Sequence, residues 1–326
     1  MQTLPTDEAQ VVEIGRPAYR PFRVRVGRVE RLTPSFRQVT FTGPDLTEFG
    51  DDGLDQRIKL ILPDGPRLPA DLAADDGGAS WYAQWLAMPE SIRPAMRTYT
   101  VRRARPWDAA VDVVLVDHDT GHGPPGPAVR WLRNAGPGDE IVLVGPDARS
   151  PDRHQGIDWR PGAARRLLLA GDETAAPAIV AILESLAGDV DGVDGGVTAR
   201  AFVEVPDDRD RLPADLPDHT RIHWLPRGGG THGELLGPAV ADWLDGHARL
   251  LDAVRALGAQ RLDDIDVDQE LLWDTPDPTG EAFYAWMAGE AAAIKALRRA
   301  VVTDRGVDRR QVAFMGYWRQ GQAERS

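Results

Sequence analysis

The 326-residue chain contains no cysteine. This absence excludes disulfide scaffolds, thiolate metal sites, Fe–S clusters and cysteine nucleophiles. Basic residues are also scarce, because 38 Lys and Arg face 51 Asp and Glu, which gives a formal net charge of −13. A chain this acidic would repel a phosphate backbone unless its positive charge gathered on one face. We therefore expect no nucleic-acid partner.

Long apolar runs are missing as well. Runs such as 167–170 and 175–183 fall far short of the roughly 20 residues that cross a membrane. The first ten residues lack the basic stretch and apolar run of a signal peptide. We therefore expect a cytoplasmic protein that does not bind a membrane, and we expect it to be a monomer.

Charge is distributed unevenly along the chain. Residues 1–157 hold 19 basic and 22 acidic side chains, net −3, whereas residues 158–326 hold 19 and 29, net −10. The nearly neutral first half contains a cluster of arginines, which form either a solvated strand face or a surface for an anion. The cluster consists of Arg93, Arg97, Arg102, Arg103 and Arg105.

The first half reads as short strands with hardly any helix between them. Residues 22–29 alternate apolar and polar side chains with period two, and Gly, Pro and Asp clusters separate the further candidates. Six such strands predict a small antiparallel barrel or sandwich, and closure into a barrel would also remove exposed edges. The candidates are 22–29, 36–41, 57–62, 97–103, 111–116 and 140–144.

The second half alternates strands and helices. Residues 166–170 form a continuous apolar run, as expected of a parallel strand buried on both faces, and a helix at 175–186 follows at once. This pattern predicts a doubly wound parallel sheet, and hence two domains, 1–157 and 158–326. An acidic stretch within 246–278 reads as a solvated loop. The remaining elements are strands at 199–205, 221–225, 282–287 and 311–317, and helices at 233–257 and 290–303.

One strand candidate carries the residues for holding a flat, phosphorylated ligand. Arg97, Tyr99 and Val101 share a strand face. The guanidinium of Arg97 can bind a phosphate in bidentate fashion, and the ring of Tyr99 can lie against a planar heterocycle. Thr100 can hydrogen-bond the edge of such a heterocycle. By pattern alone, an ordinary strand with exposed arginines remains an equal interpretation.

The run Arg97-Thr98-Tyr99-Thr100 resembles the R-x-Y-T flavin-binding motif of the ferredoxin-reductase-like superfamily. Over nearly its whole length, from about Arg23 to Arg319, the chain resembles the siderophore-interacting proteins, which are FAD-dependent ferric-siderophore reductases. The resemblance implies an N-terminal FAD-binding barrel followed by an NAD(P)H-binding domain. It also implies that Arg97, Tyr99, Thr100 and Val101 bind FAD.

A second matching segment is the glycine- and proline-rich loop that follows the strand at 111–116. It leads into a short helix, whose first N–H groups favour an anion. The resemblance places the FAD pyrophosphate and ribityl chain along this loop. Two histidines, at positions 118 and 122, without carboxylates at ligand spacing give little support to a metal site, so we expect none. The residues assigned to FAD here are Asp117, His118, Gly126, Pro127, Ala128 and Trp131.

A third segment, Gly171-Asp172-Glu173-Thr174, directly follows the buried strand at 166–170. Glycine at the turn, Thr174 as an N-cap and Pro177 in the first turn indicate a helix start at the carboxyl edge of the sheet, where α/β proteins bind ligands. A capped structural helix is the competing interpretation. The run is similar to the family's nicotinamide-side G-D-E-T-x-x-P motif, which would place Thr174 near the nicotinamide and make Tyr99, Thr100 and Thr174 the catalytic residues.

The end of the next strand leaves the choice of nicotinamide cofactor open. Glu204 suits the ribose diol of NADH, whereas Arg209 or Arg211 can pair with the 2′-phosphate of NADPH. Either NADH or NADPH is therefore consistent with the sequence.

Two C-terminal segments complete the resemblance. Trp286, Gly289 and Glu290 match the family's W-x-A-G-E motif near the nicotinamide, with glycine permitting close approach of a ligand. Tyr317 and Trp318 match a G-Y-W-R motif, and this aromatic pair either covers the flavin or closes the core.

Together these features predict a flavoprotein that moves a hydride from NADPH or NADH to FAD and reduces Fe(III) bound by a siderophore. Without cysteine, FAD is the expected sole redox relay. Arg93, Arg102 and Arg103 are the candidate platform for the anionic ferric siderophore. Two alternatives stay open: a reductase whose acceptor is a separate, ferredoxin-like redox protein, and a siderophore carrier without enzymatic activity.

Overall fold

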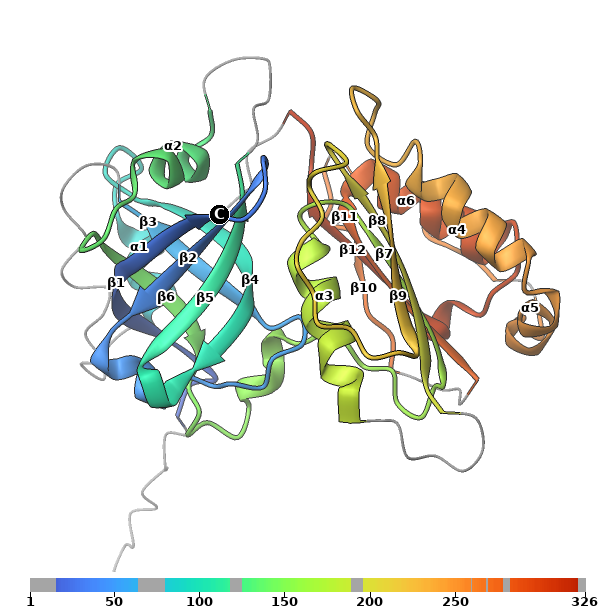
Figure 1. Ribbon diagram of the computed structural model, residues 1–326, viewed down its shortest axis with the longest axis horizontal. Helices are drawn as coiled ribbons and strands as arrows, with labels where there is room; N and C mark the ends of the chain where they lie inside the picture. The colour runs from blue at the N-terminus through green and yellow to red at the C-terminus, as the bar shows by residue number, and fades with distance from the viewer. Residues whose placement is uncertain are drawn as a thin grey trace, which may run out of the picture.

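The computed structural model describes residues 16–63, 80–117, 125–188, 196–258, 260–267, 269–277 and 282–321. His118, which the sequence assigns to FAD binding, lies outside these residues. The chain forms two units that lie side by side, a barrel and an α/β unit (Figure 1).

The N-terminal unit is a closed barrel in which every strand pairs antiparallel with its neighbours, in the order β1-β2-β5-β4-β3-β6. The period-two alternation of the sequence determines which side chains of β1 fill the barrel. Phe22, Val24 and Val26 are buried, while Arg23 and Arg25 are exposed. The predicted six-stranded antiparallel barrel is confirmed. Its strands are β1 (Tyr19–Arg31), β2 (Phe36–Thr42), β3 (Arg57–Leu62), β4 (Ala95–Arg105), β5 (Ala110–Val116) and β6 (Glu140–Pro146).

Two short helices cover the outside of the barrel, α1 (Trp81–Ala87) and α2 (Pro127–Asn134). Helix α2 begins where the sequence predicts, with Gly126 as its N-cap and a proline at its first position, whose missing N–H costs nothing there.

The second unit is a six-stranded sheet in the order β10-β12-β11-β7-β8-β9. All neighbours are parallel except the two-residue edge strand β10, which runs antiparallel to β12. The sheet thus has the predicted parallel core, and the antiparallel edge makes it a mixed sheet. Its strands are β7 (Arg166–Gly171), β8 (Thr198–Val205), β9 (Thr220–Pro226), β10 (Trp273–Asp274), β11 (Phe283–Glu290) and β12 (Val312–Trp318).

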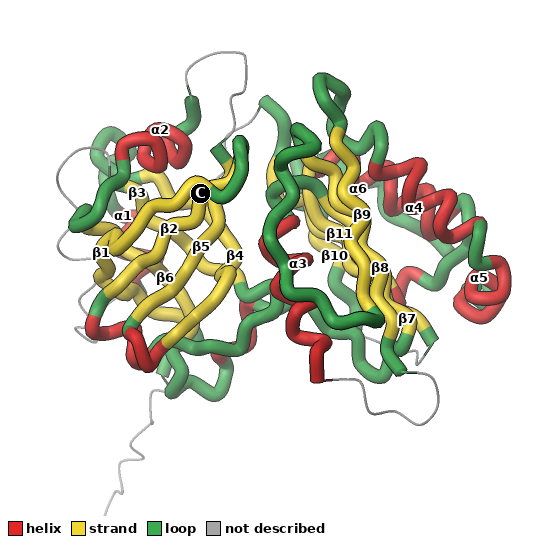
Figure 2. The backbone as a smooth tube through the Cα atoms, viewed as in Figure 1, coloured by secondary structure: helices red, strands yellow, loops and turns green. Residues whose placement is uncertain are grey.

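Helices cover both faces of this sheet (Figure 2). Helix α3 (Ala176–Ser185) packs on the face toward the barrel, in a core that also includes Phe36 of the barrel. Helices α4 (Leu236–Asp245) and α6 (Ala291–Arg298) pack on the opposite face, and α5 (Ala248–Val254) follows α4. The sheet is therefore doubly wound.

The structure corrects one sequence-based expectation in this unit. The single helix expected at 233–257 is two helices, because α4 ends at Asp245 and the low helix propensity of Gly246 favours a break there. The acidic stretch within 246–278 is loop over its described residues 263–267, as the sequence predicts, and the short strand β10 follows it. Strand β10 has two residues, too few for a periodic signal.

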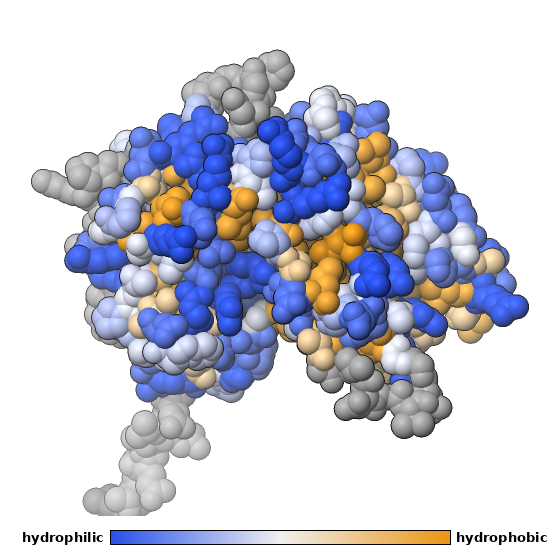
Figure 3. Space-filling view, viewed as in Figure 1, coloured by the Kyte–Doolittle hydropathy of each residue, from blue (hydrophilic) through white to orange (hydrophobic). Residues whose placement is uncertain are grey.

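The described surface has no extended apolar face in the view of Figure 3, where hydrophilic residues predominate and apolar areas are small. Among the described residues, none of the helices combines the length and apolar character that crossing a membrane requires.

Candidate functional site

Strand β4 carries the R-x-Y-T residues on the barrel. Tyr99 is half-buried and packs against the barrel core together with Val101, while Thr100 is only 6% exposed. Arg97 is half-buried and donates to the carbonyl oxygen of Met96 at 2.7 Å. The structure therefore places Tyr99 and Val101 on one face of the strand, as the alternation predicts.

Helix α2 lies against this strand and against β3. Ala128 and Trp131 pack on the same barrel core as Tyr99, and the Trp131 ring stacks on Phe41 with centroids 6.2 Å apart. The R-x-Y-T strand and the G-P-A helix, which β5 separates in the sequence, are therefore neighbours in space. Trp131 anchors the helix on the barrel.

Asp117 also holds helix α2 in place, through two ion pairs. Its carboxylate pairs with Arg37 and with Arg133 of α2, each at 2.8 Å. Burial alone would raise the pKa of Asp117, but the two guanidinium groups lower it below its usual value. The structure thus gives Asp117 a positioning role for α2.

The donor set around β4 and α2 fits a flavin dinucleotide. It offers the guanidinium of Arg97, the ring of Tyr99, the hydroxyl of Thr100 and the N–H groups of the first turn of α2. A Cβ atom on Gly126 would meet nothing within 4 Å, so the approach to this helix start is open. FAD bound there supplies the capacity to accept a hydride and to release electrons one at a time.

Strand β4 also contacts α3 of the α/β unit. A β-bulge between Val101 and Arg103 turns Arg102 toward this helix, where its guanidinium binds both carboxylate oxygens of Glu184 at 2.7 and 2.8 Å. The strand with the flavin motif is thereby tied to the helix that begins beside the G-D-E-T turn.

This ion pair corrects the predicted substrate platform. Arg102 is engaged with Glu184, and Arg93 donates to the carbonyl oxygens of Leu86 and Met88 at the end of α1. Both guanidinium groups therefore have structural partners. Arg103 is exposed, as a substrate contact requires.

The G-D-E-T turn lies at the carboxyl edge of the sheet, where β7 ends. Gly171 is required by packing, since a Cβ atom there would come within 2.5 Å of the Ala288 carbonyl oxygen. The N-cap of α3 is Ala175, so the expectation that Thr174 caps this helix is wrong. The Thr174 hydroxyl instead donates to Asp172 at 2.5 Å.

Asp172 organises this edge. Its carboxylate also accepts from the backbone N–H of Glu290 at 2.7 Å and from Trp318 Nε1 at 2.8 Å. Burial is the main cause that raises its pKa to about 6, and the charge of Glu173 adds to the rise. Gly289 belongs to the same arrangement, because a Cβ atom there would come within 2.8 Å of the Asp172 carboxylate. The two glycine turns thus meet at one buried carboxylate.

Glu173 is fully buried and forms a bidentate pair with Arg227 at 2.6 and 2.7 Å. His232 Nε2 lies 3.4 Å from the same carboxylate, and its ring meets the edge of Trp318 with centroids 4.7 Å apart. Sequence reasoning missed Arg227 and His232. The sequence does carry a signal for these two residues, the glycine run 228–230 shortly after strand β9. Such a run indicates a loop at the ligand-binding edge of the sheet.

Two predicted cofactor contacts are corrected because their carboxylates cap helices. Glu204 is fully buried and accepts from backbone N–H groups at the start of α4. Glu290 is the N-cap of α6 and accepts from the N–H groups of Ala292 and Ala293 at 2.8 and 3.0 Å. Neither carboxylate faces outward from the sheet edge.

Trp286 lies in the interior, and Tyr317 packs half-buried against the same core. Trp286 is fully buried and its Nε1 donates to the Asp55 carboxylate of the barrel at 3.1 Å, so it joins the two units. Tyr317 stacks on Trp273 with centroids 5.7 Å apart, and burial raises its pKa well above the usual value. Both members of the aromatic pair are half-buried, Tyr317 against the core and Trp318 beside Asp172.

The comparisons with known proteins match both units. Residues 25–150 match the siderophore-interacting FAD-binding domain, and residues 164–321 match the siderophore-interacting protein family. An uncharacterized protein of Mycobacterium tuberculosis is 33% identical over 320 residues, which cover 95% of this chain and 93% of that protein. The chain belongs to the siderophore-interacting protein family.

Other relatives of this siderophore-interacting protein have named activities or solved structures. Ferric vibriobactin reductase ViuB of Vibrio cholerae is 26% identical over 298 residues, covering 91% of this chain and 89% of that protein. A siderophore utilization protein from T. fusca is 25% identical and superposes with a TM-score of 0.62, covering 95% of this chain and 97% of that chain. The ferredoxin reductase in carbazole 1,9a-dioxygenase, 16% identical with a TM-score of 0.54 over 93% of this chain and 71% of that one, shares the fold.

Proposed function

We propose that this protein is a cytoplasmic, FAD-dependent reductase that takes a hydride from NAD(P)H and reduces Fe(III) bound by a siderophore, releasing Fe(II). One observation carries the proposal: β4, with the R-x-Y-T residues, contacts both α2 and α3. A flavin held on β4 and α2 would thus face the sheet edge to which NAD(P)H would bring its nicotinamide. The named activity of ferric vibriobactin reductase supports the same acceptor.

The electron balance of this reaction is simple. A hydride carries two electrons and each Fe(III) accepts one, so one NAD(P)H reduces two ferric siderophores and leaves NAD(P)⁺ and one proton. With no cysteine in the chain, an internal Fe–S relay is excluded. The protein's part is therefore to hold the flavin and to admit the two substrates in turn.

In this proposal the boundary between the two functional units falls after residue 157.

The test begins with the absorption spectrum of the purified protein. We expect flavin bands, anaerobic bleaching by NADPH or NADH, and reoxidation by ferric siderophores with two Fe(II) captured per nicotinamide. Tyr99→Ala should lose most of the bound flavin, whereas Tyr82→Ala, at a 41% exposed tyrosine of α1, should retain it. A colourless wild-type protein that still binds a ferric siderophore would establish the carrier instead. Reoxidation only by a ferredoxin-like protein would establish a redox-protein partner.

A further inference from the structure

A hollow of about 390 Å³ lies beside the edge strand β10, at the end of helix α6. Three arginines line it, Arg298 from the last turn of α6 and Arg309 and Arg310 from the turn before β12. Two aspartates, Asp263 and Asp274, also line it. Arginines therefore outnumber carboxylates around this hollow, although the whole chain has a net charge of −13.

Arg298 is the deepest of the three arginines, with a side chain only 8% exposed. Its Nη1 donates to the carbonyl oxygen of Asp263 at 3.1 Å, and its Nη2 donates to the Asp274 carboxylate at 3.2 Å. Its Nε is buried and has no hydrogen-bond partner among the described residues. A buried donor without an acceptor is costly, and the guanidinium fork matches the oxygens of an anion. An anion in the hollow would bring the missing acceptor.

Arg309 and Arg310 are exposed, and their side chains are available for exchange. Arg310 pairs with Asp308 at 2.6 Å, and exposed ion pairs of this kind add little stability. The Nη1 of Arg309 donates to the carbonyl oxygen of Arg261 at 3.4 Å, a long bond that a charged oxygen can replace. The backbone beneath them is fixed, because their N–H groups donate to Gln260 and Asp308 at 2.8 and 3.0 Å. This order reduces the cost of fixing a ligand there.

The hollow is remote from the candidate redox site. Arg310 lies two residues before β12 begins, whereas Trp318, at the end of the same strand, donates to Asp172 at the G-D-E-T turn. Eight residues of extended strand span roughly 25 Å. A ligand in the hollow would therefore leave the flavin and nicotinamide positions free.

We propose that this hollow binds a phosphate dianion, with Arg309 and Arg310 at its mouth and Arg298 at its base. The phosphate is either free or the end group of a small monoester. A terminal phosphate offers three strong acceptor oxygens, one for each arginine, whereas a carboxylate offers two. This site goes beyond the proposed reductase activity and does not depend on it.

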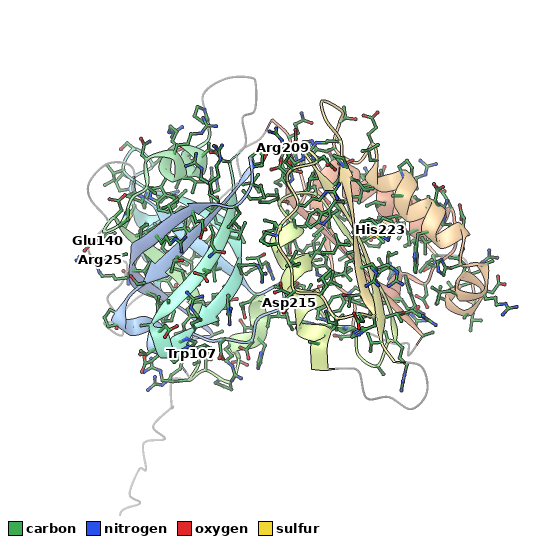
Figure 4. All side chains as sticks on the ribbon, viewed as in Figure 1. Arg25, Trp107, Glu140, Arg209, Asp215 and His223 are labelled. Carbon is green, nitrogen blue, oxygen red and sulfur yellow. The ribbon has the colours of Figure 1, made fainter. Side chains whose placement is uncertain are left out.

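The direct test is a calorimetric titration of the purified full-length protein at fixed ionic strength, with inorganic phosphate in one arm and glycerol 3-phosphate in the other. We expect Arg309→Ala/Arg310→Ala to bind the preferred ligand at least about 10-fold more weakly than the wild type. Arg25→Ala is the matched control, because Arg25 is also an exposed arginine in an ion pair, with Glu140 at 2.7 Å. Arg25 and Glu140 lie on the side of the barrel away from the α/β unit (Figure 4), so this variant should bind as the wild type does.

The two arms also identify the source of the phosphate. Tighter binding of glycerol 3-phosphate would support a monoester, tighter binding of inorganic phosphate would support the free ion, and equal binding would show that the phosphate group alone is recognised. No binding in either arm, or an unaffected double variant, would overturn the inference.

Amide hydrogen exchange locates the bound phosphate independently of any variant. Saturating phosphate should slow exchange in residues 298–311 and leave β4 unchanged, because a ligand that binds only the folded state suppresses local opening around its site. Slowing confined to β4, α2 or the G-D-E-T turn would place the phosphate at the candidate redox site and overturn the inference.

Discussion

Replacing Asp55 by asparagine should reshape the pH dependence of stability. The Asp55 carboxylate is fully buried and accepts three neutral donors, the N–H groups of Asp158 and Trp159 and the Trp286 indole, each at 3.1 Å. Burial is the main cause that raises its pKa from 3.8 to about 6. Because the folded-state pKa is above the unfolded value, this group's stabilisation is complete below pH 3.8 and is lost as the pH rises through about 6.

The magnitude follows from the same pKa. A rise from 3.8 to about 6 corresponds to about 3 kcal/mol once the carboxyl is fully ionised, and about 2 kcal/mol of this falls between about pH 4.5 and pH 7.5. The asparagine side chain of the variant cannot ionise, although its amide group must face one of the three donors, which costs about 1–3 kcal/mol at every pH. The free energy of unfolding of Asp55→Asn, minus that of the wild type, should therefore increase by about 2 kcal/mol over this range.

Urea unfolding followed by tryptophan fluorescence at the two pH values measures this difference. All other titrating groups are shared by both proteins and cancel in the comparison. Asp51→Asn, at an exposed position four residues away, should show no such increase. A difference that stays constant from about pH 4.5 to about pH 7.5, or that falls, would refute the reasoning about the buried carboxyl.

Three further predictions concern the candidate site. Gly171→Ala should lower the free energy of unfolding by about 1–3 kcal/mol in urea titrations, because its Cβ meets a β11 carbonyl, whereas Gly237→Ala, with open space in α4, should be neutral or stabilising. Tyr99→Phe should keep the flavin absorbance that Tyr99→Ala loses, since the ring rather than the hydroxyl covers the heterocycle. Trp318→Phe removes a donor to the Asp172 carboxylate and so raises its pKa further above 3.8. Because the ionised Asp172 carboxylate accepts from the Thr174 hydroxyl and the Glu290 N–H and so positions the sheet edge, the acid limb of the pH–rate profile for NADPH oxidation should move to higher pH. An unmoved limb would contradict this positioning role.

Local sequence patterns were enough to specify the two units and their contents. Strand alternation in 22–29 specified the barrel face, and the apolar run 166–170 specified a parallel strand, because burial on one or two faces imposes those patterns. The R-x-Y-T, G-P-A and G-D-E-T runs located the segments of the candidate site. Each of these patterns lies within one short segment of the chain, so it can be recognised without knowing what the segment packs against.

Which carboxylates and arginines remain available to ligands depends instead on the folded chain. Glu204 and Glu290 read as cofactor contacts in the sequence, yet both cap helices, and Arg102 reads as a substrate contact, yet it binds Glu184 82 residues away. Asp55 and Trp286, 231 residues apart, gave no local sign of their bond. A buried polar group must find a partner wherever the fold brings one within reach, and a local motif does not record that distance.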